Sequence, residues 1–241
     1  HNLATLERLR QLDEHPEGES PYLIVSLGDS SVQGMGASRV TESYPARLAS
    51  AIAQQMDREV LLLNLSLSGA TIESVELTQL PQMRGLGLLD GPYRPDLVTL
   101  TIGGNDVMAE DMAPGQFEER LRRILAALPS GALVSTIPSF GIMPQESRAQ
   151  DMSDRIRAAV EDSDAHLVDL RSLTQEYSLP TYTFVYHAAD FFHPNSAAYA
   201  KWAQLFADAW AESRREPAPV VEDAPQWDML SARVAQSEYD D

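Results

Sequence analysis

The chain has 241 residues, of which 44% are hydrophobic, enough to bury a substantial core in a single domain. Its 36 acidic and 18 basic residues give a formal charge of −18, so nucleic acid and anionic lipid surfaces should repel it. The absence of cysteine excludes disulfides, thiolate chemistry and zinc sites built from Cys. No apolar run approaches the roughly 20 residues of a membrane span, so we expect no stable membrane insertion.

The N-terminal stretch "HNLATLERLRQL" predicts an amphipathic helix. It lacks the long apolar centre of a signal peptide. We therefore assign residues 1–20 to an N-terminal helical segment. A cytoplasmic location is the expectation. The chain starts at His1, so export stays open: an exported protein would have had an upstream signal that was removed.

Apolar runs rich in β-branched residues predict five buried strands, at residues 22–27, 60–65, 97–102, 132–137 and 166–170. Apolar residues at helical spacing predict helices at residues 44–56, 115–128, 151–162 and 195–213. Strands that alternate with helices favour a parallel sheet with helices on both faces. Residues 21–215 would form this α/β domain, with its chemistry just beyond the carboxyl ends of the strands.

The composition changes from residue 216 onward. Prolines and acidic residues cluster there, which predicts an acidic, Pro-containing C-terminal tail over residues 216–241. Within it, "WDMLSARVAQ" is compatible with a short docked helix and equally with disorder.

Three of the predicted strands run into residues suited to chemistry. The first continues into "GDSS", the second into "SLSGAT" and the third into "GGND". A fourth segment, "DFFHPN", comes just before the last predicted helix. Because the carboxyl ends of parallel strands meet at one edge of a sheet, the three strand ends should lie close together.

Together the four segments hold every group that acyl transfer needs. Ser30 can act as the nucleophile and His193 as its base, because imidazole titrates near neutrality. Asp190 lies three residues before His193, a spacing that lets its carboxylate reach the ring Nδ1 and fix the tautomer. The backbone N–H groups of Ser30 and Gly69 and the side-chain amide of Asn105 would stabilise the oxyanion.

Each of these features has an ordinary structural explanation when taken alone. A serine at a strand-to-helix turn is more often an N-cap, and a glycine there more often serves a tight turn. An Asn-Asp pair commonly forms an Asx turn. Their combination at one predicted edge favours the catalytic interpretation.

The four segments resemble those of the SGNH (GDSL) hydrolase family. "GDSSVQG" is similar to its first block, with Ser30 as the family's serine, and "NLSLSG" to its second, with Gly69 as the oxyanion glycine. "GGND" resembles the third block, with Asn105 as the oxyanion amide, and "DFFHPN" the fifth, with Asp190 and His193. The resemblance implies a three-layer α/β/α, flavodoxin-like fold with a five-stranded parallel sheet, and no metal or cofactor.

One position departs from the family pattern. The residue after the serine is often aliphatic or Thr, and here it is Ser31. By the resemblance Ser30 is the nucleophile, and Ser31 is expected to cap the helix or to point inward. The G-x-S-x-G elbow of the α/β-hydrolases, a rival fold for the same triad, is absent.

The other candidates have mainly structural interpretations. Asp29 and Asp106 are able to bind a cation, but we expect them to accept backbone N–H bonds and hold the loops rigid. His187 is expected to lie in the pocket or on the surface. The chain has no H-E-x-x-H ligand pair and no complete G-x-G-x-x-G motif, so we expect neither a metal nor a dinucleotide site.

The substrate prediction rests on three long connections, residues 80–95, 138–146 and 178–189, which carry apolar and aromatic side chains. If they ring the site, they suit an acyl or aryl group, although the same residues would also serve to cover the sheet. The predicted activity is hydrolysis of short- to medium-chain carboxylic esters through an acyl-enzyme on Ser30. The alternatives are a carbohydrate deacetylase or a thioesterase with the same triad, and a non-catalytic binding module. The sequence specifies neither the natural ester nor the oligomeric state.

Overall fold

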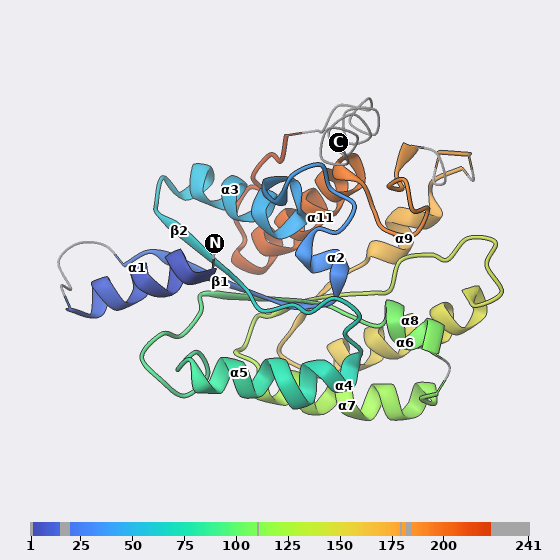
Figure 1. Cartoon of the computed structure of the whole chain (residues 1–241), viewed down its shortest axis with the longest axis horizontal. Helices are drawn as coiled ribbons and strands as arrows, with labels where there is room; N and C mark the ends of the chain where they lie inside the picture. The colour runs from blue at the N-terminus through green and yellow to red at the C-terminus, as the bar shows by residue number, and fades with distance from the viewer. Residues whose placement is uncertain (1, 15–19, 110, 179, 182–184, 223–241) are drawn as a thin grey trace, which may run out of the picture.

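The computed structural model describes residues 2–14, 20–109, 111–178, 180–181 and 185–222 (Figure 1). The helix considered for "WDMLSARVAQ" lies outside these residues, so that prediction stays untested. The N-terminal helix is present as α1 (Asn2–Glu14). None of the helices described here has the length and apolar character of a membrane-spanning segment.

Five parallel strands form a single sheet in the order β2-β1-β3-β4-β5. This order is that of flavodoxin-like doubly wound sheets, and it confirms the predicted fold class. Each strand lies where the sequence predicts one, although the last four end before the predicted residue: β1 (Tyr22–Gly28), β2 (Val60–Asn64), β3 (Leu97–Thr101), β4 (Leu133–Ser135) and β5 (His166–Val168).

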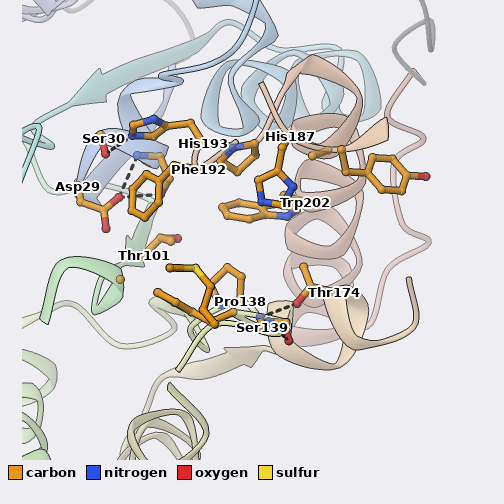
Figure 2. A pocket seen from close by; sticks show the side chains of 18 of the residues that line it. Asp29, Ser30, Thr101, Pro138, Ser139, Thr174, His187, Phe192, His193 and Trp202 are labelled. Atoms are coloured by element: carbon orange, nitrogen blue, oxygen red, sulfur yellow. Dashed lines mark hydrogen bonds between the residues drawn. The ribbon is translucent and has the colours of Figure 1, made fainter. Parts of the chain in front are cut away.

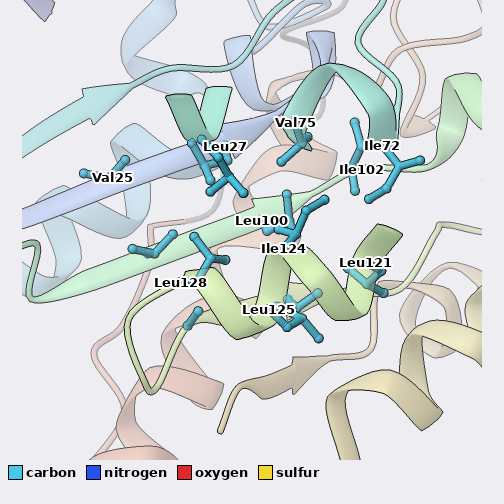
Figure 3. Close-up of a cluster of buried hydrophobic side chains, with 14 of the residues drawn as sticks. Val25, Leu27, Ile72, Val75, Leu100, Ile102, Leu121, Ile124, Leu125 and Leu128 are labelled. Atoms are coloured by element: carbon cyan, nitrogen blue, oxygen red, sulfur yellow. The ribbon is translucent and has the colours of Figure 1, made fainter. Parts of the chain in front are cut away.

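Helices cover both faces of the sheet, as Figure 1 shows. One face carries α3 (Tyr44–Met56) and α11 (Ser196–Arg214). The other carries α5 (Leu80–Gly85), α7 (Pro114–Ala127) and α8 (Glu146–Glu161). Figure 3 shows the core on this side, where Leu121, Ile124 and Leu125 of α7 lie near Leu100 of β3. Shorter helices lie in the connections: α2 (Ser30–Gln33), the 3₁₀ helix η1 (Val40–Glu42), α4 (Ile72–Ser74), the π-helix η2 (Val75–Gln79), α6 (Gly104–Ala109) and α9 (Leu170–Gln175).

The central and edge strands differ in burial. All five residues of β3 are buried, as expected for a continuous apolar run covered on both faces. In β2, however, only Leu63 is fully buried, because this strand forms one edge of the sheet. Helix α1 protects that edge, where the Thr5 hydroxyl donates to the Leu62 carbonyl at 2.9 Å.

An aromatic cluster joins α3 and α11 to the carboxyl end of β3. The ring of Tyr44 stacks on Phe206 with 4.5 Å between centroids, and Trp202 lies beside both. The Tyr44 hydroxyl is hydrogen-bonded to the Thr101 hydroxyl at 2.9 Å, in a fully buried setting. Burial raises the pKa of Tyr44, so its phenol stays neutral and able to donate.

The expectation that residues 80–95 ring the functional edge is wrong. This connection leads into the amino end of β3, where the Asp96 N–H donates to the Leu23 carbonyl at 2.9 Å. Leu88 and Leu89 within it are buried in the core. A chain that enters a parallel strand must first return to the amino edge of the sheet, and this connection makes that return.

Gly28, the last residue of β1, has the closest backbone packing at the carboxyl edge. Its φ is +141°, and an added Cβ would lie 2.0 Å from the Thr101 carbonyl oxygen and 2.6 Å from Val32 Cγ2. We therefore expect Gly28→Ala to lower the free energy of unfolding by roughly 2–4 kcal/mol, measured by urea denaturation. Gly85→Ala is the matched control, because that glycine is helical and a Cβ there meets nothing within 4 Å. Equal midpoints for the two variants would contradict the packing argument.

Candidate active site

Ser30 begins the short helix α2 directly after β1. The helix is capped by Asp29, whose carboxylate accepts from the Ser31 N–H at 2.9 Å and from the Ser31 hydroxyl at 2.7 Å. The expectation that Ser31 caps this helix is therefore wrong, because Ser31 is the donor and Asp29 the cap. Both serines line the pocket, but the Ser31 hydroxyl is bonded to Asp29, whereas the Ser30 hydroxyl lies 2.9 Å from His193 Nε2.

Asp29 is a buried carboxylate beside the candidate nucleophile. Only 7% of its surface is exposed, and burial raises its pKa, while the two hydrogen bonds from Ser31 act in the opposite direction. Its contacts agree with the expected role of holding a loop through a backbone N–H.

Gln79 holds the carboxyl end of β1 in place. No sequence motif singled out this residue. Its side chain is fully buried and pairs with both backbone groups of Gly28, accepting from the N–H at 2.9 Å and donating to the carbonyl at 2.8 Å. β2 ends its pairing with β1 at Asn64, before Gly28, whereas β3 still pairs with Gly28 through Thr101. The Gln79 side chain thus supplies amide hydrogen bonds to β1 beyond the end of β2. Gln79 comes from the π-helix η2, and such helices are frequent near functional sites.

His193 and Asp190 lie on a tight turn just before α11. The Asp190 carboxylate accepts from the backbone N–H groups of Phe192 at 3.0 Å and of His193 at 2.9 Å. Its second oxygen lies 2.6 Å from His193 Nδ1, and His193 Nε2 lies 2.9 Å from Ser30 Oγ. Three side chains predicted from the sequence thus form one hydrogen-bonded chain.

The electrostatics of this turn favour a charged Asp190. Partial burial opposes the carboxylate, but hydrogen bonds from the His193 ring and from the Phe192 and His193 N–H groups outweigh it and lower the pKa of Asp190. The carboxylate therefore remains available to orient the imidazole and to balance a positive charge on it.

Two further contacts fix the turn in place. The buried Asn195 side chain donates to the carbonyls of Val185 at 2.7 Å and His187 at 3.2 Å, and it also caps α11. Gly36 packs against the turn so closely that a Cβ would lie 2.4 Å from the Pro194 carbonyl oxygen and 3.0 Å from His193 Cβ. The loop after α2 and the turn before α11 are therefore braced against each other.

The second and third predicted blocks meet beside Ser30. The Asn105 side-chain amide donates one hydrogen to the Ala70 carbonyl at 2.8 Å, and its second hydrogen is left for another acceptor. Gly69 is exposed and lies one residue before Ala70. Asn105, Ser30 and His193 line the same pocket, whereas Gly69 stands outside its lining.

Asp106 links these two blocks. Its carboxylate accepts from the Ile72 N–H, at 3.1 Å to each oxygen, which agrees with the expectation for this residue. The side chain is 1% exposed, and burial raises the pKa of Asp106 to about 6 despite that bond. Within the described part of the chain, no group of three or more His, Cys, Asp or Glu side chains is arranged to hold a metal ion.

A pocket of about 300 Å³ opens beside Ser30. Figure 2 shows Ser30 and His193 on one side of it, with Trp202 and His187 farther along and Ser139 and Thr174 opposite. Residues 138–143, together with Tyr186 and His187, line the pocket, as expected for two of the three connections. The wall is mainly apolar and aromatic, from Phe140, Ile142, Met143, Tyr177, Phe192 and Trp202.

An ion pair between the partly exposed Glu146 and the buried Arg171 holds the connection after β4. The Glu146 carboxylate accepts from the Phe140 N–H at 2.6 Å and the Ser139 hydroxyl at 3.2 Å, and it is bonded to the guanidinium of Arg171. Arg171 is 1% exposed. Thr174 adds a second tie by accepting from the Ser139 N–H at 2.8 Å. The wall of the pocket is thus fixed by residues with no recognisable sequence motif.

Comparison with known proteins identifies the family. The sequence model of the GDSL-like lipase/acylhydrolase family matches residues 26–201, most of the chain. This chain belongs to that family. The resemblance seen in its four segments is therefore confirmed, and the protein is a GDSL hydrolase by family. No curated protein matches the chain in sequence.

Solved structures share the fold of this GDSL hydrolase. LAE5, an α/β hydrolase enzyme from the metagenome of Lake Arreo in Spain, is 23% identical, with a TM-score of 0.61, covering 80% of this chain and 97% of its own. The acetylxylan esterase Axe2 from Geobacillus stearothermophilus is 18% identical over 79% and 94%, with a TM-score of 0.60. An extracellular lipase from Streptomyces rimosus is 20% identical over 78% and 99%, with a TM-score of 0.58. At these identities the likeness supports the fold alone.

The raised pKa of Asp106 has a consequence for the stability of the GDSL hydrolase. At pH 7 the carboxyl is charged in both the folded and the unfolded chain, and burying that charge destabilises the fold. As the pH falls below about 6, the folded form takes up a proton before the unfolded form does, and the cost is relieved. We expect Asp106→Asn, which keeps an acceptor for Ile72, to raise the free energy of unfolding at pH 7 by up to about 3 kcal/mol.

This gain should shrink as the pH falls from 7 to 4, and urea denaturation at each pH measures it. Asp208→Asn, at an exposed position on α11, is the control, because it removes a carboxylate that is not buried. A gain for Asp106→Asn that stays constant over this range would contradict the buried-charge argument.

Proposed function

We propose that this GDSL hydrolase is a serine esterase that cleaves short- to medium-chain acyl or aryl carboxylic esters. The observation that carries the proposal is the hydrogen-bonded chain from Ser30 Oγ through His193 to Asp190. A nucleophile, a base and a group that orients the base are the parts that acyl transfer requires. A non-catalytic binding module would not require these three hydrogen-bonded side chains beside an open pocket.

Catalysis would begin with attack of Ser30 Oγ on the ester carbonyl carbon. His193 Nε2 takes the hydroxyl proton, and Asp190 stabilises the imidazolium that results. Collapse of the tetrahedral intermediate expels the alkoxide, which leaves as an alcohol with the proton from His193. Water, deprotonated by His193, then attacks the acyl-enzyme and releases the carboxylic acid and a free Ser30.

The oxyanion would be stabilised by the backbone N–H of Ser30, the backbone N–H of Gly69 and the second hydrogen of the Asn105 amide. The bond from Asn105 to Ala70 holds the amide in one orientation, so that little reorganisation is needed during the reaction. The same bond ties the third block to the second, next to Gly69.

The composition of the pocket supports an acyl or aryl substrate. Its wall is dominated by aromatic and aliphatic side chains, and an apolar group gains free energy by leaving water for such a wall. A polyhydroxylated sugar would find few polar partners on those side chains. The deacetylase and thioesterase alternatives use the same triad and differ in the substrate: an acetyl ester of a sugar for the first, and a thioester, which releases a thiol, for the second.

The nucleophile is tested by a fluorophosphonate probe, which reacts with activated serines. We expect the wild-type protein and Ser31→Ala to be labelled and Ser30→Ala to remain unlabelled, because only Ser30 is bonded to His193. The same three proteins should be assayed on p-nitrophenyl esters from acetate to octanoate. Wild-type hydrolysis at background on every ester, or labelling of Ser30→Ala, would contradict the proposal.

The oxyanion assignment is tested by Asn105→Ala. Loss of one oxyanion donor should lower kcat by about 10²–10³ with a smaller change in KM. Because Asn105 also bonds to Ala70, the thermal midpoint must be measured to show that the variant is folded. A folded variant that loses no more than a factor of two in kcat would rule out Asn105 as a donor.

A further inference from the structure

Most of the large apolar side chains that are exposed in the described residues gather at one edge of the molecule. They come from loops and the short helix α6 at the carboxyl edge of the sheet. We refer to these residues as the apolar rim: Met35, Leu67, Met108, Ile142, Met143, Phe191 and Phe192. Single exposed apolar residues are normal, but a group of them around one site marks an interaction surface.

The backbone contacts of the rim place it next to the catalytic groups. The Met35 N–H donates to the Ser30 carbonyl at 3.0 Å, and the Leu67 N–H donates to the Gly28 carbonyl at 3.1 Å. Met108 lies on α6, the helix that carries Asn105. Parts of the chain far apart in sequence thus contribute apolar side chains to the surroundings of one serine.

Four members of the rim also line the pocket. Ile142 is 82% exposed, Phe191 57%, Phe192 43% and Met143 39%, yet each contributes to the pocket wall. The apolar lining therefore continues from the pocket onto the outer surface. A dissolved ester needs only the lining, whereas an ester held in an apolar layer could pass along such a surface without returning to water.

Phe191 is kept exposed at a cost in backbone energy. Its φ is +56°, in the left-handed region that a bulky side chain rarely adopts. The bonds from the Phe192 and His193 N–H groups to Asp190 hold the turn in this shape. Unfavourable backbone of this kind is concentrated at sites that bind ligands. Glycine would adopt this backbone conformation without strain, yet residue 191 is phenylalanine.

The net charge of the protein limits the kinds of surface to which the rim could bind. The chain carries a formal charge of −18. An anionic surface would repel this protein. A neutral or zwitterionic surface has no such penalty and gains from burial of the rim.

We propose that the apolar rim docks the protein on a neutral or zwitterionic lipid–water interface, with the mouth of the pocket facing the ester layer. The interface would deliver ester directly to Ser30, and in this respect the inference rests on the proposed esterase function. Docking itself requires the rim alone, so it is measurable in a protein that lacks the nucleophile.

The experiment uses Ser30→Ala protein mixed with phosphatidylcholine vesicles and separated by sedimentation. A second protein adds Ile142→Gln and Phe191→Asn, since Asn accepts the left-handed backbone of position 191. The matched control adds Leu3→Gln on α1 and Leu77→Gln on η2 instead, two residues that are 84% and 62% exposed and do not line the pocket. We expect the rim variant to bind at least about tenfold more weakly than the control, which should bind like Ser30→Ala itself.

Vesicles of phosphatidylglycerol, an anionic lipid, test the expected repulsion. At low salt they should bind the Ser30→Ala protein more weakly than phosphatidylcholine vesicles do. Absence of sedimentation with phosphatidylcholine, or equal binding by the rim and control variants, would overturn the proposal. So would a rim variant that changes only self-association measured without vesicles, which would make the rim an interface between copies of the chain. If docking is found but the wild-type protein fails to react with the fluorophosphonate probe, the esterase proposal fails and the docking surface stands.

Discussion

The hydrogen bond between Ser30 Oγ and His193 Nε2 is the interaction on which the rest of the site depends. It joins side chains 163 positions apart in sequence, one at the end of a central strand and the other on a turn before the last helix. Neither backbone is free to adjust. Gly28 packs against the Thr101 carbonyl, and Gly36 packs against the His193 turn. The packing of the domain therefore sets the distance between Ser30 Oγ and His193 Nε2.

Buried polar groups supply the rigidity that this distance needs. Gln79 pairs with both backbone groups of Gly28, Asp29 caps the helix that Ser30 begins, and Asp106 accepts the Ile72 N–H. Burial penalises the two charged carboxyls and raises their pKa values, yet each is bonded to a backbone N–H that no other group satisfies. Burying these charges lowers the stability of the fold, but the bonds hold the loops in place. A site in which several groups must keep fixed distances requires such loops.

The pocket and its surroundings are formed mainly by apolar side chains. Glu146 and the buried Arg171 hold the connection after β4 so that its apolar side chains form one wall. Some of those side chains, Ile142 and Met143 among them, are also exposed outside the pocket. One polar framework thus supports an apolar surface that begins beside Ser30 and extends to the exterior. The polar framework fixes the chemistry, while the apolar surface selects what reaches it.

The sequence by itself determined the local elements: where each strand lies, the central helices, the Ser and Asn side chains at predicted strand ends, and the Asp and His side chains just before the last predicted helix. These follow from periodicity and from residue chemistry, which act over a few positions. Only the tertiary structure decided that β2 is a partly exposed edge, that residues 80–95 return to the opposite edge, and that Asp29 rather than Ser31 caps α2. It also revealed Gln79, Glu146 and Arg171, whose partners are distant in sequence. No local pattern contains the identity of a distant partner, because that identity arises only when the folded chain brings the two groups together.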